Sequence, residues 1–222
     1  MRSPSSPAVL SSLIKQLKAD KAILVLNGTI LAGLIALALY AKLEQKGYGI
    51  ILLFADDFNS KRPYLGLFTS ISELLWCLSA AICFFSYSLS RSMIKRRADL
   101  FILYSGIGIS ILLLDDVFRF TLILNTYAGI PKLLMYTVYG GAAIAYGLLF
   151  RQKILKTPYA LLFISGILFI ISGAADMVPL AGQGTPAMLE DGTKLLGLLN
   201  IALYFWQVCR QEVLQTLKQF GS

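Results

Sequence analysis

Six long, mostly apolar stretches dominate this sequence and restrict the folds that it can adopt. Each is close to the roughly 20 residues that an α-helix needs to cross the hydrocarbon core of a bilayer. The stretches are Ala22–Ala41, Tyr64–Leu89, Leu100–Phe120, Leu133–Phe150, Pro158–Ala175 and Glu190–Cys209. Charged residues make up 14% of the chain, against about 25% in a typical soluble domain. The sequence therefore predicts an all-α, polytopic integral membrane bundle of six transmembrane helices.

The basic residues predict the orientation of these helices. Most of them lie in the N-terminal segment, in the loops at 91–97 and 151–156, and in the tail. Because loops rich in Lys and Arg stay on the cytoplasmic side, we expect both termini to be cytoplasmic. Residues 22–210 then form a single membrane domain, followed by a short tail at 211–222. We expect the basic residues 1–21 to form a short amphipathic helix on the membrane surface.

The absence of histidine and the positions of the cysteines limit the chemistry that this chain can perform. The chain contains no histidine, which excludes histidine-ligated zinc or haem and catalysis by an imidazole base. Cys77, Cys83 and Cys209 all lie in apolar stretches. We therefore expect them to behave as small buried hydrophobes, with neither a disulfide nor thiol chemistry. We predict no cofactor, although a hard cation or protons would suit the carboxylates of this chain.

The net charge of +8 does not indicate nucleic-acid binding. The basic residues occur in short blocks between apolar stretches, a distribution that sets topology and builds no groove for a duplex. The densest block is a candidate contact for anionic lipid or for a cytoplasmic protein. It consists of Arg91, Lys95, Arg96 and Arg97.

Glu73 interrupts the second apolar stretch and is the most informative single residue. It lies about ten residues from the outer end, roughly 13–15 Å deep at a rise of 1.5 Å per residue. Ionisable residues at that depth are costly and commonly functional. We expect its helical face to point inward, because that face is small and polar. The face consists of Gly66, Thr69, Ser70, Cys77 and Ala80. Glu73 is then either a proton or cation relay or a protonated acid bonded to a neighbouring helix.

Other polar residues cluster at the outer ends of the helices. They are Asp115, Asp116, Asp176, Glu190, Asp191, Lys194 and Asn200. Asp115 shares a face with Ser105, so we expect it to point inward more than Asp116 does. A helical ion pair between Glu190 and Lys194, four residues apart, is an alternative explanation for those two residues. Together these positions predict a carboxylate-lined polar cavity open to the non-cytoplasmic side.

Three functions are consistent with this pattern. The leading hypothesis is proton- or cation-coupled transport or ion binding, without catalysis. The first alternative is a membrane scaffold or assembly factor that binds a second copy or another membrane protein. The second alternative is an intramembrane lipid-modifying enzyme that uses acidic residues. The short chain and loops are typical of a bacterial plasma membrane protein.

Overall fold

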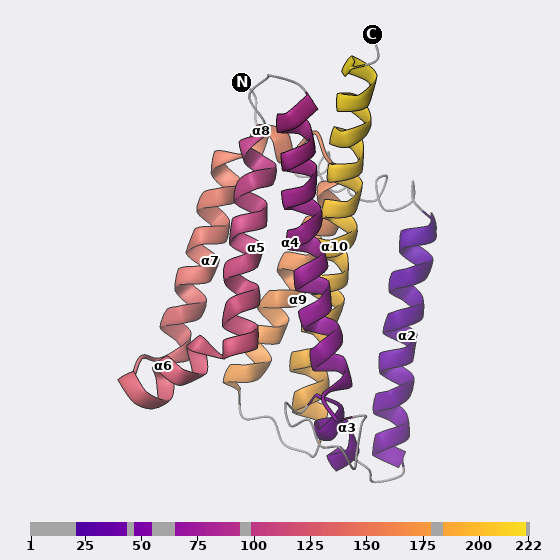
Figure 1. Cartoon of the computed structure of the whole chain (residues 1–222). Helices are drawn as coiled ribbons and strands as arrows, with labels where there is room; N and C mark the ends of the chain where they lie inside the picture. Colours follow the sequence, from indigo (N-terminus) through magenta and orange to yellow (C-terminus); the bar gives the residue numbers. More distant parts are fainter. Residues whose placement is uncertain (1–20, 44–46, 55–64, 94–98, 179–183, 221–222) are drawn as a thin grey trace, which may run out of the picture. The chain divides into compact units, whose positions relative to one another are not determined.

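The computed structural model describes residues 21–43, 47–54, 65–93, 99–178 and 184–220. These residues form nine helices and no strand, which confirms the all-α prediction. The helices are α2 (Lys21–Leu43), α3 (Gly47–Leu53), α4 (Leu67–Met93), α5 (Leu100–Phe118), α6 (Phe120–Ala128), α7 (Lys132–Leu149), α8 (Arg151–Ile154), α9 (Tyr159–Met177) and α10 (Thr185–Phe220) (Figure 1). The predicted surface helix at the N-terminus falls almost entirely outside the described residues.

Four of these helices are long and apolar enough to cross a bilayer, so the chain is an integral membrane protein. The candidate spans are Ile23–Tyr40, Leu67–Ser92, Leu100–Phe118 and Tyr159–Met177. The predicted fourth and sixth spans correspond to α7 and α10, which are not among these four. Lys194, Asn200 and Gln207 lower the mean hydropathy of α10. In α7, Lys132 and several glycine and tyrosine residues have the same effect.

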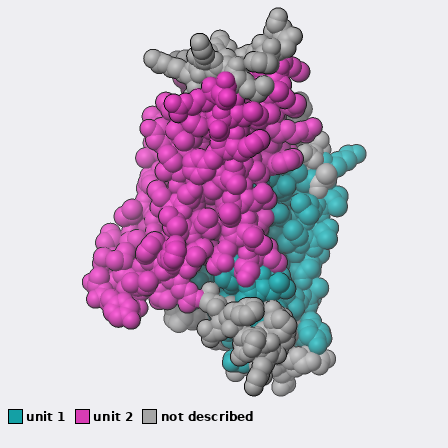
Figure 2. Space-filling model, in the orientation of Figure 1, with its two compact units in different colours: residues 1–69, 158–203 teal, residues 70–157, 204–222 magenta. Residues whose placement is uncertain are grey.

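The chain divides into two compact units (Figure 2). Unit 1 comprises residues 1–69 and 158–203, and unit 2 comprises residues 70–157 and 204–222. Nearly all of α4 therefore belongs to unit 2. Helix α10 contributes its first half to unit 1 and its second half, from Tyr204, to unit 2.

In unit 2, α4 buries one stripe of residues, here called the serine seam. The seam consists of Ser72, Trp76, Ser79, Cys83, Ser86 and Ser90, each at most 7% exposed. Its alternating spacing of four and three residues keeps these side chains on one helical face. Small side chains let two helices approach closely within a membrane, where their hydroxyl groups can bond across the interface.

Two hydrogen bonds show that the seam packs against the second half of α10. The Ser86 hydroxyl donates to the Cys209 carbonyl over 3.5 Å, and the Ser90 and Thr216 hydroxyls lie 3.2 Å apart. Residue numbers increase in the same direction on both helices, so α4 and this half of α10 run parallel.

Helix α5 packs on the neighbouring side of α4, where Gly106 leaves room for two side chains. A Cβ atom at Gly106 would lie 3.1 Å from Phe84 Cε1 and 3.2 Å from Cys83 Cβ. On its other side, α5 contacts α7 through a hydrogen bond between Ser105 and Tyr146. The short helix α6 lies across the ends of α5 and α7 (Figure 1).

Unit 1 is held together by polar contacts between α2, α9 and α10. Asn200 on α10 donates to Asn27 Oδ1 on α2 over 2.7 Å, and Ser165 on α9 donates to the Gly197 carbonyl over 2.7 Å. A small apolar core around Ile50 and Phe54 forms where α3 ends. With seven residues, α3 is too short to span the membrane.

Substituting Gly106 should destabilise the protein. Gly106→Leu would force a side chain into the contact with Phe84 and Cys83, and such overpacking costs about 1–3 kcal/mol. The expected result is a lower thermal-unfolding midpoint, measured by circular dichroism in detergent. The matched control is Gly108→Leu on the same helix, because no atom lies within 4 Å of a Cβ there. Equal midpoints for the two variants would contradict the packing described for α5.

Candidate functional site

Glu73 lies near the start of α4, where its side chain is half-buried. It borders the serine seam, since Ser72 and Trp76 on either side are 5% and 4% exposed. Within the described part of the chain, no hydrogen bond or ion pair reaches the Glu73 carboxylate. A carboxylate in a spanning helix is therefore left available to a proton, an ion or another molecule.

The prediction that the helical face around Glu73 points inward is partly wrong. Gly66 and Ala80 are buried, but Ser70 and Cys77 are exposed. The helix presents the serine seam to α10 in preference to the face that carries Cys77. Glu73 consequently lies at the edge of the buried face and not at its centre.

Asp115 caps helix α6. One carboxylate oxygen accepts from the Thr121 backbone N–H over 2.8 Å, and the Thr121 hydroxyl donates to both oxygens over 3.0 and 2.9 Å. The Tyr139 phenol on α7 also interacts with Asp115 and Thr121. The chain reaches this arrangement because Arg119, with φ of 53°, takes a left-handed conformation that separates α5 from α6.

The remaining charged candidates are half-buried. Each makes a polar or electrostatic contact in the structure. They are Asp116, Asp176, Glu190, Asp191 and Lys194. Glu73, Asp115 and Asp116 belong to unit 2 and the others to unit 1. Across the described residues, no group of three Cys, Asp or Glu side chains is placed to hold a metal ion.

Asn200 is the most buried of the predicted site residues, at 1% exposed. Its amide nitrogen donates to Asn27 Oδ1 and, over 2.8 Å, to the Leu196 carbonyl. Its buried Oδ1 accepts no hydrogen bond from the residues that the structure describes. Asn200 therefore joins two helices through its nitrogen and keeps an acceptor available for a water molecule.

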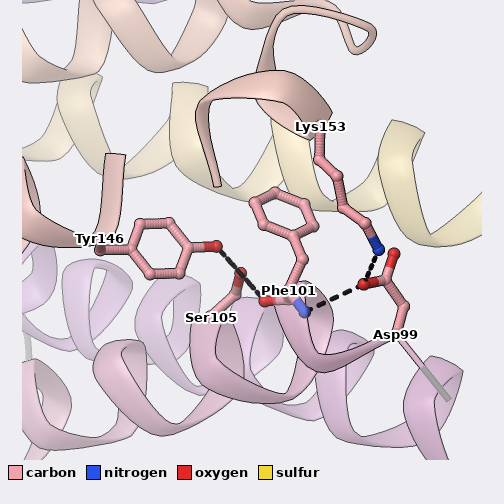
Figure 3. A network of polar contacts seen from close by, with 5 residues as sticks. All are labelled: Asp99, Phe101, Ser105, Tyr146 and Lys153. Atoms are coloured by element: carbon pink, nitrogen blue, oxygen red, sulfur yellow. Dashed lines mark hydrogen bonds and ion pairs between the residues drawn. The ribbon is translucent and has the colours of Figure 1, made fainter. Parts of the chain in front are cut away.

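A polar network that the sequence did not predict lies at the start of α5 in unit 2 (Figure 3). Asp99 accepts from the Phe101 backbone N–H over 3.0 Å, as a helix N-cap does, and pairs with Lys153. One turn further on, the Ser105 and Tyr146 hydroxyls contact each other, and their oxygens lie 2.7 and 3.3 Å from the Phe101 carbonyl oxygen. One hydroxyl can donate to the other while the second donates to the carbonyl. The position of Asp99 directly before an apolar stretch was the available signal for this cap.

Glu212 on α10 is electrostatically coupled to this network. Burial and the Asp99 carboxylate raise the pKa of Glu212, and Lys153 partly opposes the shift. The position lies beyond Arg210, where the predicted cytoplasmic tail begins. Of the basic block proposed to contact lipid, Arg91 is exposed at the end of α4, and the other three residues lie outside the described residues.

A comparison with known protein families assigns this chain to one of them. A family model described as Domain of unknown function (DUF8692) matches residues 28–208, which is most of the chain. The chain belongs to the DUF8692 family. No curated protein and no solved structure shows significant similarity to it. The DUF8692 match spans all the predicted site residues, and its description assigns them no activity.

Asp115 and Thr121 should be energetically coupled. Removing either partner, in Asp115→Ala or Thr121→Val, should release α6 and lower the free energy of unfolding. A hydrogen bond to a charged group typically contributes about 1.5–3 kcal/mol. A double-mutant cycle by thermal unfolding should therefore give a coupling energy of that order. Strictly additive effects would contradict the cap.

Replacing Glu212 should change how stability depends on pH. A raised pKa means that the folded state holds the proton more tightly than the unfolded chain does. The resulting stabilisation is present at low pH and is lost as pH rises from the ordinary value of 4.5 through the folded-state pKa. Glu212→Gln should raise the unfolding midpoint at about pH 8 and leave it unchanged at about pH 4. A midpoint that Glu212→Gln lowers at about pH 8 would reverse the assigned sign.

Proposed function

We propose that this protein is a proton-coupled transporter, with Glu73 as the proton-binding carboxylate. The observation that carries the proposal is the state of Glu73. It is half-buried in a candidate span, with no hydrogen-bond or ion-pair partner among the described residues. The other acidic candidates already have partners. Ionisable side chains inside a membrane span are costly and commonly mark proton or ion pathways.

A proton fits this site better than a metal cation does. Calcium takes six to eight oxygen ligands and magnesium requires octahedral coordination. A single carboxylate supplies at most two oxygens, and the described residues include no group of three Cys, Asp or Glu side chains placed to hold a metal ion.

The proposed topology has six spans with both termini in the cytoplasm. In addition to the four candidate spans, α7 with 18 residues and α10 with 36 residues are long enough to approach or exceed a bilayer core. The distribution of basic residues supports the orientation. A location in the bacterial plasma membrane is part of the same proposal.

One observation favours a scaffold as the second candidate function. Helix α7 contains no buried residue. Its glycines at 140, 141 and 147 have no atom within 4 Å of an added Cβ, among the residues described. Small residues on a membrane helix are suited to close packing against another helix. If a partner helix packs on α7, the polar residues serve to hold helices together, and Glu73 is not required for function.

Proton flux into proteoliposomes tests the leading proposal. The purified protein is reconstituted with an enclosed pH-sensitive dye, and a pH gradient is imposed with potassium and valinomycin to balance charge. Glu73→Gln should lower the flux by an order of magnitude or more, because glutamine cannot exchange a proton. The matched control is Glu212→Gln, which makes the same change in the tail. Undiminished flux in folded Glu73→Gln would reject the role of Glu73.

Infrared titration identifies the ligand without depending on turnover. The carbonyl band of protonated Glu73, assigned by its loss in Glu73→Gln, is followed in nanodiscs as pH is raised, and its disappearance marks release of the proton. A band that ignores added Na⁺, K⁺, Ca²⁺ and Mg²⁺ agrees with a proton site. A shift with one of these ions would replace the proton with a cation as the ligand. A band that stays protonated up to about pH 9 would favour the scaffold.

A further inference from the structure

Two thiols meet within the serine seam of unit 2. Cys83 on α4 and Cys209 on α10 are 0% and 2% exposed, and both are free cysteines. Ser86, one turn from Cys83 on the same face of α4, donates to the Cys209 carbonyl over 3.5 Å, so the two thiols lie on facing sides of the seam. Gly106 on α5 closes one side of Cys83, with its Cβ position 3.2 Å from the Cys83 Cβ. The third cysteine, Cys77, is exposed on a different face of α4. From the sequence we expected three small buried side chains with neither a disulfide nor thiol chemistry, and the expected burial is wrong for Cys77.

The surroundings of the pair favour one chemistry. A soft metal ion would need two thiolates, and the described residues offer no third Cys, Asp or Glu ligand to complete such a site. Two thiolates would also place negative charge inside a candidate span, at a high desolvation cost. A disulfide is neutral and apolar, so it suits these surroundings. The contact of Ser86 with Cys209 keeps the two helices close at this level of the seam.

We propose that Cys83 and Cys209 form a reversible disulfide that joins α4 to α10. Two S–H bonds break, one S–S bond forms, and two electrons and two protons pass to an oxidant. We assign that oxidant to the class of lipid-soluble quinones, which would be reduced to the hydroquinone. Cys83 lies nine residues inside the end of the span at Ser92, roughly 13 Å deep at 1.5 Å per residue. A water-soluble oxidant would have to cross that apolar layer.

Ser86 prepares Cys209 for this reaction. Its hydroxyl, one turn from Cys83, donates to the Cys209 carbonyl and also interacts with the Cys209 thiol. A thiolate is the reacting form in disulfide chemistry, and a hydroxyl donor stabilises it. Ser86 is therefore placed beside Cys209 while the bond to Cys83 closes.

Thiol counting on the full-length protein in nanodiscs tests the proposal. The protein is incubated with a short-chain benzoquinone, denatured, and labelled with a maleimide–polyethylene glycol that shifts its gel mobility once per free thiol. The reduced protein carries three labels, from the three cysteines. After oxidation we expect one label, on Cys77, with an intact mass lower by two hydrogen atoms. Dithiothreitol should restore all three labels.

Single substitutions locate the bond. Cys77→Ser should still close the disulfide and go from two labels to none. Cys83→Ser and Cys209→Ser should each keep two labels after oxidation. Serine is chosen as the replacement because it already occurs at several positions of this seam. Oxidation should also raise the thermal-unfolding midpoint of the native sequence and of Cys77→Ser, but of neither other variant. Three labels remaining after quinone treatment, or a bond that requires Cys77, would overturn the proposal. Both results are independent of proton flux.

Discussion

The close approach of α4 to α10 is the constraint on which unit 2 depends. Within a bilayer, helices gain little by burying apolar surface, because lipid is as apolar as their side chains. Association then requires tight packing and hydrogen bonds between helices. The serine seam supplies both, since Ser86 and Ser90 reach Cys209 and Thr216 while presenting little bulk. The same closeness brings Cys83 to Cys209 and makes Gly106 the residue that fits beside Cys83.

The helical class could be predicted from the sequence because it depends only on the length and composition of apolar stretches. Helix α4 was predicted over Tyr64–Leu89 and begins and ends within four residues of those bounds, at Leu67 and Met93. Its buried face could not be predicted in the same way. Stripes through Cys77 and through Cys83 both carry small residues at helical spacing, and only the contacts with α10 distinguish them.

Asp115 and Thr121, six residues apart, would lie on different faces of a continuous helix. They meet because the helix breaks at Arg119.

Unit 1 shows how few contacts can attach a membrane helix. Only 6% of the candidate span in α2 is buried, so packing contributes little to its position. Asn27 bonds to Asn200, and Leu34 lies 3.8 Å from the Cβ position of Gly192. Hydrogen bonds between membrane helices average about 0.6 kcal/mol, with a maximum near 1.7 kcal/mol. Within unit 1, the bond from Asn200 and the contact of Leu34 at Gly192 are therefore among the few interactions that position α2.

The position of Glu73 beside the serine seam links its protonation to the packing of α4. An ionised carboxylate at this edge must recruit water, a cation or a donor, whereas the neutral acid can remain against apolar surroundings. Cys83 lies ten residues further along the same helix, roughly 15 Å away at 1.5 Å per residue. A bond from Cys83 to Cys209 would therefore fix the seam without touching the carboxylate. Any effect of that bond on the proton affinity of Glu73 would have to pass through the packing of α4. Helix movement at the seam, and not direct chemistry between the two sites, would then connect the redox state of the thiols to the protonation of Glu73.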